Sequence, residues 1–339
     1  MKTILITGVG GPTPRSIAKT IRRLHPEYKI IGIDANPKAL GFYIPGLIDK
    51  HFLAPRAMEE SYWPFINDLI KKEKIDLAFV QPELEVIAWG DYFNYTGTFP
   101  CQVLIPPVEL ASVLLDKSKM AEILEGTEYI PKTVKISQID QRLSEVANDI
   151  KFPCWIRANK GSGGLGSLKV ESVDSLKSWL LINREISNYT VSEFLPGRHL
   201  ATQMLYIGGK YTKGASIECV EYVMASIAPS KVTGNTSFGR FINEEDILKF
   251  CDSCIKYICA RLNTMAHGVL SFDLKEDIDG RPKVTEVNIR HMAYTGVMAQ
   301  AGFDLISDTI TVLSSEDHLK PQHFFCFNKL YVFLRDVDP

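Results

Sequence analysis

Residues 285–290 have the sequence Thr-Glu-Val-Asn-Ile-Arg, and this stretch decides how the rest of the chain is interpreted. Its valine and isoleucine are β-prone, and the Asp-Gly pair at 279–280 is typical of a hairpin turn between two strands. Side chains two residues apart in a strand point to the same face, so Glu286, Asn288 and Arg290 are expected to form one row.

Asp273 precedes this turn and is expected to face the row from the neighbouring strand. Two carboxylates and an amide oxygen suit Mg²⁺, which prefers a few oxygen ligands together with phosphate oxygens and water. An adjacent arginine can form paired hydrogen bonds with a phosphate. The alternative is an exposed strand face whose polar residues serve solubility, and the hairpin alone leaves both interpretations open.

Composition indicates an ordinary globular protein. The 339 residues are 45% hydrophobic and 23% charged, which is enough chain for two or three subdomains. The net charge of −2 disfavours nucleic acid or an anionic membrane as a partner. Seven cysteines do not indicate a disulfide framework, no apolar run approaches the roughly 18 residues of a membrane span, and a cytoplasmic location is expected.

The cysteines at 251 and 254 raise the question of a zinc site, but their neighbours favour a helix. Apolar residues and cysteines recur at helical spacing, and no second Cys or His pair lies nearby. The predicted buried face comprises Ile247, Cys251, Cys254, Ile255, Ile258 and Leu262.

The first 112 residues alternate predicted strands and helices. Strands at 3–7, 29–34, 75–80 and 102–105 are interleaved with helices that include 16–24 and 62–74. This order predicts an open parallel sheet of the Rossmann-like kind, whose ligands bind at the carboxyl ends of the strands.

A glycine turn at 8–14 follows the first strand, and Asp34 ends the second. An NAD(P)-dependent enzyme would use such a turn and acid, but Thr13 stands where the third glycine of Gly-x-Gly-x-x-Gly belongs. The other interpretation is a tight turn that lets the helix start close to the sheet. Glu83 and Glu85 lie at another strand end and are candidate substrate contacts, unless they serve only the helix dipole.

A second glycine-rich stretch follows Arg157. Four of the six residues at 161–166 are glycine, so the loop between two predicted strands has N–H groups that can fold over phosphates. No Gly-Lys-Ser/Thr opens a helix after it, which excludes a Walker loop. An unused hairpin tip is the alternative.

The ordered set of motifs resembles the ATP-grasp superfamily, closest to its carbamoyl-phosphate-synthase-like and biotin-carboxylase-like branches. It consists of Asp-Lys at 116–117, the arginine and glycine loop at 157–166, Glu-Phe-Leu-Pro-Gly at 193–197, Asp273, and Glu-x-Asn-x-Arg at 286–290. The resemblance spans most of the chain to about residue 313. It implies an α/β domain at 1–112, an ATP-grasp lobe with a glycine-rich lid at 113–190, a catalytic α+β lobe at 191–313 and a C-terminal strand extension at 314–339.

The resemblance also implies roles for individual residues. Two Mg²⁺ ions, with Mn²⁺ as an alternative, would be held by Asp273, Glu286 and Asn288, and Arg290 and Arg157 would act in catalysis. The implied ATP contacts are Lys117, Arg157, Gly161, Ser162, Gly163, Gly164, Gly166, Glu193, Phe194, Leu195 and His199.

Two departures from the family pattern matter. His199 stands where many relatives have a ribose-binding glutamate. The residues from His291 to Gly296 replace the Gln-Val-Glu-His that biotin carboxylases use, so biotin carboxylation is not expected.

The leading hypothesis is an ATP-dependent carboxylate–amine ligase that acts on small molecules through an acyl-phosphate. The alternatives are a small-molecule kinase, a carbamate-forming enzyme, a non-catalytic nucleotide-binding protein and an NAD(P)-dependent enzyme. Glu83 and Glu85 could receive an amine, and Arg198 or His291 a carboxylate. Apolar stretches at 324–327 and 331–334 predict added strands, with two placements open: the protein's own sheet, or a second subunit of a homodimer.

Overall fold

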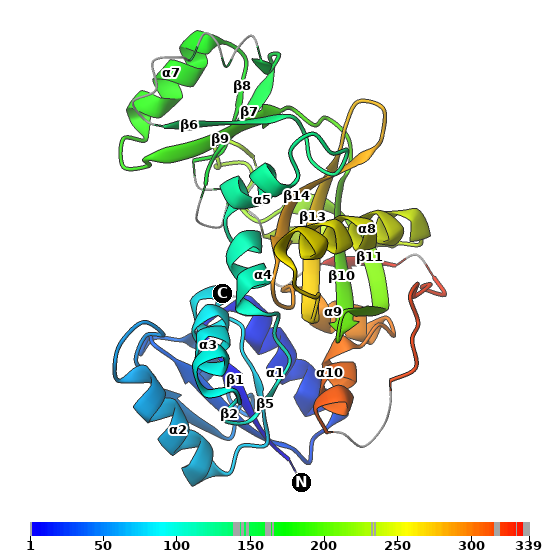
Figure 1. Ribbon diagram of the computed structural model, residues 1–339. Helices are drawn as coiled ribbons and strands as arrows, with labels where there is room; N and C mark the ends of the chain where they lie inside the picture. The colour runs from blue at the N-terminus through cyan, green and yellow to red at the C-terminus, as the bar shows by residue number, and fades with distance from the viewer. Residues whose placement is uncertain are drawn as a thin grey trace.

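The computed structural model describes residues 2–137, 143, 146, 149–159, 164, 166–231, 233, 235–314, 319–329 and 331–334. These residues form a mixed α/β structure with three sheets (Figure 1). One sheet is parallel and the other two are antiparallel.

The N-terminal sheet is parallel, as predicted. Its five strands lie in the order β3-β2-β1-β4-β5. Their bounds are β1 Thr3–Thr7, β2 Lys29–Asp34, β3 Lys50–Leu53, β4 Leu77–Phe79 and β5 Gln102–Val103. The short 3₁₀ helix η1 is Leu40–Phe42, and the helices are α1 Pro12–Leu24, α2 Tyr62–Glu73 and α3 Glu83–Thr96.

Both faces of this sheet are buried, which explains the continuous apolar run of β1. Ile4 and Ile6 pack into a cluster with α1, while Leu5 points to the opposite face and packs into a cluster with α2 and α3. A strand that is buried on both faces carries no polar alternation. The strand β3 was not predicted, and its mixed sequence Lys-His-Phe-Leu is mostly exposed.

Two short helices connect the parallel sheet to the rest of the chain. They are α4, Val108–Leu114, and α5, Lys117–Ile123. Asp116 marks the start of α5, because it caps the helix by accepting hydrogen bonds from the N–H groups of Ser118 and Lys119 at 3.1 and 3.3 Å. The expected domain boundary at 112 falls inside α4.

The second sheet is antiparallel, with the order β6-β9-β7-β8. Its strands are β6 Thr133–Ser137, β7 Cys154–Ala158, β8 Leu168–Val170 and β9 Asn188–Glu193, and the helix α7, Val173–Ile182, packs beside β8. Because β9 extends to Glu193, this sheet continues past the expected lobe boundary at 190.

The third sheet has six strands in the order β14-β13-β10-β11-β12-β15. Its strands are β10 His199–Ile207, β11 Lys210–Tyr222, β12 Thr236–Ile242, β13 Gly268–Glu276, β14 Pro282–Asn288 and β15 Val332–Leu334. The helices that accompany it are α8 Glu245–Leu262, α9 Thr295–Gln300 and α10 Leu305–Ser314.

The cysteines of α8 lie in the core, as the helical spacing predicted. Cys251 and Cys254 are fully buried together with Ile247, Ile255 and Ile258. Leu262, at the end of the helix, is only partly buried. Burial raises the pKa of Cys254 to about 12, so this thiol stays protonated in the folded protein.

The C-terminal segment packs on the protein's own sheet. The strand β15 pairs with β12, with Phe333 buried opposite Gly239. The strand expected at 324–327 is not formed. Instead, the Phe325 N–H donates to the Gly214 carbonyl at 2.9 Å and the Phe327 N–H donates to Asn243 Oδ1 at 2.8 Å.

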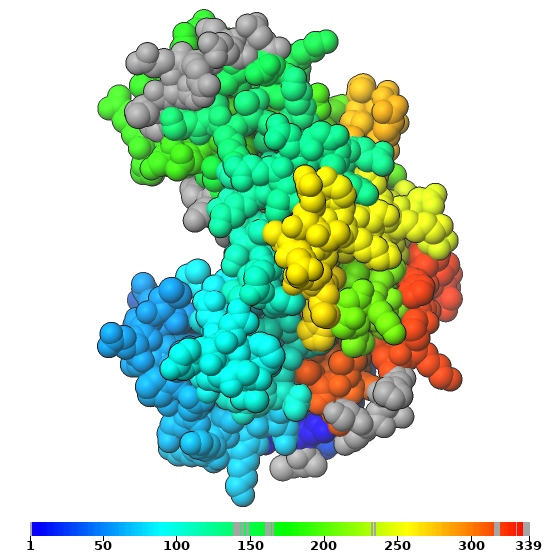
Figure 2. Space-filling model, viewed as in Figure 1, coloured from blue at the N-terminus to red at the C-terminus, as the bar shows by residue number. Residues whose placement is uncertain are grey.

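The three sheets are stacked along the molecule, with α4 and α5 between the parallel sheet and the small antiparallel one (Figure 1). The small antiparallel lobe, green in Figure 2, stands apart from the blue N-terminal domain. The N-terminal domain is joined to the third sheet where α1 packs on α9 and α10. Within the described ranges, no helix combines the length and apolar character that a membrane crossing requires.

Candidate active site

A cavity of about 860 Å³ collects residues from both antiparallel sheets and from the segments that follow β1 and β4 in the N-terminal domain. It brings together most of the residues that the sequence singled out, although they are distributed over more than 170 positions of the chain. The predicted residues in its wall are Lys117, Arg157, Gly164, Glu193, Phe194, Leu195, His199, Asp273, Glu286, Asn288 and Arg290.

The hairpin at the floor of the cavity is formed by β13 and β14, as predicted. Asp273 pairs with Glu286 across the ladder, and the register shifts immediately afterwards so that Leu274 pairs with Val284. This irregularity places an extra residue, Thr285, in β14. It explains why Val284 and Val287 are both buried although they are three residues apart.

The carboxylates and the amide of the hairpin form a connected set. The Asn288 side chain donates from Nδ2 to Asp273 Oδ2 at 3.1 Å, which orients the amide. The Lys117 ammonium, at the start of α5, lies 3.4 Å from Glu286 Oε1. Among the described residues, no three His, Cys, Asp or Glu side chains gather as a metal-binding group, so a cation here would depend on two carboxylates, an amide and non-protein oxygens.

Electrostatics in the hairpin fit a cation-binding role. Burial and the neighbouring Glu286 raise the pKa of Asp273 to about 7, while Arg290, Asn288 and Lys117 oppose the rise. Two close carboxylates disfavour each other's ionisation, and a divalent cation between them would reverse this effect. The all-oxygen donor set suits Mg²⁺.

Arg290 follows the strand and spans two domains. Its Nη2 lies 3.4 Å from Glu83 Oε1 at the start of α3, and its Nη1 donates to the carbonyl of His291 at 3.1 Å. Its own carbonyl accepts a hydrogen bond from Ser271 Oγ at 3.0 Å. The guanidinium therefore lies between the β13–β14 hairpin and the N-terminal domain.

Arg157 reaches the cavity from the small antiparallel sheet. In β7 the buried residues alternate with partly buried ones, so Trp155 and Arg157 share the face that lines the cavity. Burial lowers the pKa of Arg157, and Glu286 opposes this effect. Its Nε is buried and has no hydrogen-bond partner among the described residues, which leave this donor of the guanidinium unsatisfied.

The glycine loop is described only in part. Gly164 lines the cavity at φ +75° and Gly166 is buried at φ +63°. A Cβ at Gly166 would lie 2.8 Å from Ile186. The Gly166 carbonyl accepts a hydrogen bond from Trp179 Nε1 at 2.9 Å, so this glycine is packed against its own lobe. The predicted contacts Gly161, Ser162 and Gly163 lie outside the described residues.

The segment that joins the two antiparallel sheets crosses the cavity wall. Glu193 is anchored there, because its carboxylate accepts from the Lys132 N–H at 3.1 Å and its own N–H donates to the Lys132 carbonyl at 3.1 Å. The Phe194 ring lies 4.7 Å from Lys169 Nζ, and Leu195 is buried. Phe194 and Leu195 make this part of the cavity wall apolar.

His199 also lines the cavity, 4.0 Å from Asp273. Burial, and to a smaller extent the charge of Lys275, lowers the pKa of His199 to about 3, so the imidazole is neutral at physiological pH. Its ring centroid lies 5.4 Å from that of Tyr222. A neutral imidazole can hydrogen-bond a sugar hydroxyl but forms no ion pair with Asp273.

Three candidate substrate residues are engaged elsewhere. Glu85 accepts a hydrogen bond from Tyr62 Oη at 2.9 Å and does not line the cavity. His291 is 3% exposed, lies within hydrogen-bond distance of Thr295 Oγ1 at 3.2 Å and also does not reach the cavity. Arg198 is held by Glu244 and Glu276 at 2.7 and 2.6 Å. The structure therefore does not place these side chains where a substrate in the cavity would contact them.

Three N–H groups of the N-terminal glycine turn are already hydrogen-bonded within the protein. The N–H groups of Val9, Gly10 and Gly11 donate to the Ile33 carbonyl, Asp34 Oδ2 and the Gly8 carbonyl. Asp34, the acid that a dinucleotide fold would turn toward a ribose, is occupied by this turn. The geometry favours the tight-turn interpretation over dinucleotide binding.

Several wall residues were not singled out from the sequence. Trp155 and Lys169 share a face with Arg157 through the two-residue strand period and the pairing of β7 with β8, so strand alternation could have indicated Trp155. Tyr222, Lys275, Gln81 and Tyr294 reach the wall from distant elements. No local signal in the sequence marks these four.

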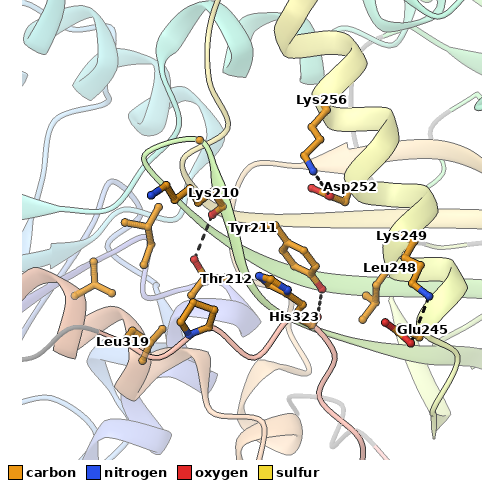
Figure 3. Close-up of a pocket in the computed structure, with 14 residues that line it drawn as sticks. Lys210, Tyr211, Thr212, Glu245, Leu248, Lys249, Asp252, Lys256, Leu319 and His323 are labelled. Atoms are coloured by element: carbon orange, nitrogen blue, oxygen red, sulfur yellow. Dashed lines mark hydrogen bonds and ion pairs between the residues drawn. The ribbon is translucent and has the colours of Figure 1, made fainter.

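A larger cavity, of about 1080 Å³, lies elsewhere and contains none of the predicted residues. Figure 3 shows two ion pairs among its side chains: Lys256 with Asp252 at 2.6 Å, and Lys249 with Glu245 at 3.4 Å. Tyr211 donates to the carbonyl of His323 at its edge. Size alone therefore does not identify the functional site, and the convergence of charged groups favours the smaller cavity.

Known proteins resemble this chain in sequence over about half of its length. No protein-family model matches the chain. The curated multifunctional protein pyrABCN of Emericella nidulans is 29% identical over 191 residues, which is 52% of this chain. The multifunctional protein ura1 of Schizosaccharomyces pombe is 30% identical over 180 residues, or 49% of this chain. The matched region covers 8% of the length of each of these relatives.

Solved structures match over nearly the whole chain. The N5-carboxyaminoimidazole synthetase of Staphylococcus aureus, complexed with ADP, has a TM-score of 0.71 at 12% identity and covers 94% of this chain and 79% of its own. The biotin carboxylase domain of Hydrogenobacter thermophilus 2-oxoglutarate carboxylase, a dimer with MgADP, ADP and bicarbonate, has a TM-score of 0.68 at 12% identity, with 98% and 73% covered. The L-amino acid ligase of Bacillus licheniformis has a TM-score of 0.66 at 14% identity, with 95% and 78% covered.

The fold that this chain shares with these three structures is the ATP-grasp fold. Identities this low show the fold, while the chemistry of this chain has to be argued from its own site. The motif order and the three-sheet architecture agree with one another, and the chain has the ATP-grasp fold.

Proposed function

We propose that this protein is an ATP-dependent carboxylate–amine ligase that forms an amide and releases ADP and phosphate. The observation that carries the proposal is the cavity in which Lys117, Arg157, the Asp273–Glu286–Asn288 set and Arg290 converge from separate elements of the fold. The N-terminal parallel sheet is taken as the Rossmann-like domain, and the two antiparallel sheets as the ATP-grasp lobes.

ATP fits the cavity with its base at the wall of Phe194 and Leu195 and its phosphates toward the hairpin. His199 lies where a neutral imidazole can bond a ribose hydroxyl. Lys117 and Arg157 supply positive charge for phosphates from opposite walls. Bound Mg²⁺ would be held by Asp273, Glu286 and Asn288, and it would neutralise phosphate charge and polarise the transferring group.

The reaction consists of two displacements. A substrate carboxylate oxygen attacks the γ-phosphorus, the bond from that phosphorus to the β,γ-bridging oxygen breaks, and ADP leaves. The amine nitrogen then attacks the acyl carbon, the carbon–oxygen bond to phosphate breaks, and the amine gives up a proton. The contribution of the chain is positioning and charge stabilisation, with Arg290 between the hairpin and the N-terminal domain placed to stabilise the transferring phosphoryl.

Isotope transfer tests the acyl-phosphate route. A screen of ADP release against pooled amino acids and other small carboxylates identifies the carboxylate, which is then labelled with ¹⁸O. One ¹⁸O atom is expected in the released phosphate per turnover. Turnover without label in phosphate would exclude the route, and a stable phosphorylated product in place of an amide would indicate a kinase.

Variants of the hairpin connect this chemistry to the site. Asp273→Asn removes a carboxylate from the proposed metal set, and ADP release is expected to fall by at least about 100-fold, because several kcal/mol of charge stabilisation are lost. Asp279→Asn lies in the exposed turn of the same hairpin and is the matched control. Equal activity in both variants would contradict the assignment.

A further inference from the structure

One end of the active-site cavity differs in chemistry from the rest. The wall residues contributed by the N-terminal domain carry no charge, whereas the opposite walls include Lys117, Arg157 and Arg290. The uncharged set is Gly8, Gly11, Pro12, Thr13, Pro14, Gln81 and Pro82. Whatever binds at this end meets a neutral surface.

Gln81 provides an unpaired acceptor at this end. The residue is 5% exposed, and its Oε1 is buried with no hydrogen-bond partner among the residues that the structure describes. The Gln81 amide has one favoured orientation, because its Nε2 donates to the carbonyl of Val80 at 3.2 Å. If Oε1 and Nε2 were exchanged, two acceptor oxygens would face each other. A buried acceptor left unpaired costs free energy, so this position favours a ligand that brings an N–H or O–H donor.

Tyr294 provides a second unpaired group from the catalytic lobe. It is 3% exposed and lines the same cavity, and its hydroxyl has no hydrogen-bond partner within the described part of the chain. The residue lies at the start of α9, beyond the hairpin that carries Arg290. A hydroxyl can accept or donate, so it accommodates either kind of group on a ligand.

The nearby helix N-terminus is poorly suited to an anion. Of the first four residues of α1, Pro12 and Pro14 have no N–H, and the Arg15 N–H bonds to the Gly11 carbonyl. The N–H groups of the preceding turn are already bonded within the turn and to Asp34. At most one N–H, that of Thr13, is left for a ligand, whereas phosphate sites at helix ends depend on several.

From these observations we propose that this end of the cavity is the amine subsite, that Gln81 Oε1 accepts a hydrogen bond from the amine, and that the acceptor substrate is a compact, unphosphorylated amine. The assignment rests on the ligase function proposed above. Gln81 positions the amine nitrogen and determines specificity, while Arg290 and the metal set act on the phosphoryl.

The test uses glycinamide, which has an amine but neither a carboxylate nor a phosphate, and inorganic phosphate as the contrasting probe. Calorimetric titration of the full chain with MgADP bound is expected to show saturable glycinamide binding that inorganic phosphate does not displace. In Gln81→Met, the glycinamide Kd is expected to rise by roughly tenfold or more, because the accepting oxygen is lost. Gln102→Met, at an exposed strand position, is the matched control and should bind like wild type.

Gln81→Glu is the second variant, since it keeps an accepting oxygen and adds a charge that favours an ammonium group. Its glycinamide affinity is expected to equal or exceed that of wild type. Absence of saturable binding, displacement by inorganic phosphate, or equal affinity in Gln81→Met overturns the subsite. Failure of MgADP to bind to wild type overturns the proposed ligase function and this inference with it, so the two failures are distinguishable.

Discussion

Glu83 and Glu85 lie in the same helical turn at the start of α3 and have different environments. Glu83 faces Arg290 across the domain boundary at 3.4 Å. Glu85 turns inward, and burial raises its pKa to about 7, while hydrogen bonds from Tyr62 and Thr7 oppose the rise. These two carboxylates, which lie two residues apart in the sequence, therefore differ: Glu83 contacts Arg290, and Glu85 is a buried group that hydrogen-bonds within the N-terminal domain.

Glu85 is expected to make stability depend on pH. Its folded pKa exceeds the unfolded value, so the folded state binds more protons between about pH 4.5 and 7, and stability falls as the pH rises through this window. Glu85→Gln should keep a hydrogen bond with Tyr62 and remove this loss, which is worth about 3 kcal/mol at most by pH 8. Urea unfolding of wild type and variant at pH 5 and pH 8 measures the difference.

The exposed Glu60 supplies the control for this experiment. Glu60→Gln should follow the wild-type dependence at both pH values. If Glu85→Gln lost as much stability as wild type between pH 5 and pH 8, a group other than Glu85 would be responsible for the pH dependence.

At the scale of elements, the start of α5 couples a helix cap to the site. Asp116 caps the helix and the next residue, Lys117, is buried and lies 3.4 Å from Glu286. The cap therefore stabilises the turn that holds the ammonium group over the hairpin. The Asp-Lys pair at 116–117, which belongs to the family resemblance, therefore also stabilises the start of α5.

Asp116→Ala is expected to cost about 1 kcal/mol of stability through the lost cap and to weaken ATP binding several-fold, because the start of the helix frays. Ser172→Ala removes the cap of α7, which forms a capping box outside the cavity wall. It should lower stability by a similar amount and leave ATP affinity unchanged. Thermal unfolding and nucleotide titration of both variants measure the two effects, and an equal loss of affinity in both would refute the coupling.

At the scale of the whole molecule, the joint between the N-terminal domain and the catalytic lobe is tightly packed. Gly296 of α9 donates its N–H to Ser16 Oγ of α1 at 3.1 Å. A Cβ at Gly296 would lie 2.6 Å from this oxygen and 2.9 Å from Thr20 Oγ1. This contact sets the distance between the neutral end of the cavity and the hairpin that carries Arg290.

Gly296→Ala is expected to destabilise the protein by about 1–3 kcal/mol through overpacking and to reduce kcat more than ATP affinity, because the two walls move apart. Adding Ser16→Ala to it frees space beside the new methyl group and should recover part of the stability. Differential scanning calorimetry and steady-state kinetics of the single and double variants test this joint. Wild-type stability in Gly296→Ala, or no recovery in the double variant, would contradict the packing argument.

The sequence by itself determined the local features of this protein. Strand and helix order in the first domain, the hairpin before residue 285, the cap at Asp116 and the buried face of α8 all follow from patterns within a few residues, because dihedral preferences and burial periodicity act over that range. The ordered motifs also indicated the fold. The bulge at Thr285 and the C-terminal pairing with β12 depend on a partner strand, which no local pattern specifies.

The tertiary structure alone decided which polar groups meet. Arg290 contacts Glu83 across 207 positions of sequence, and Lys117 meets Glu286 from another domain. The same topology directs His291 and Glu85 away from the cavity, and it leaves Gln81 Oε1 in the cavity wall with no hydrogen-bond partner among the described residues. The physical reason is that long-range contacts depend on how sheets and helices pack, and residues of equal polarity acquire different environments only when that packing is complete.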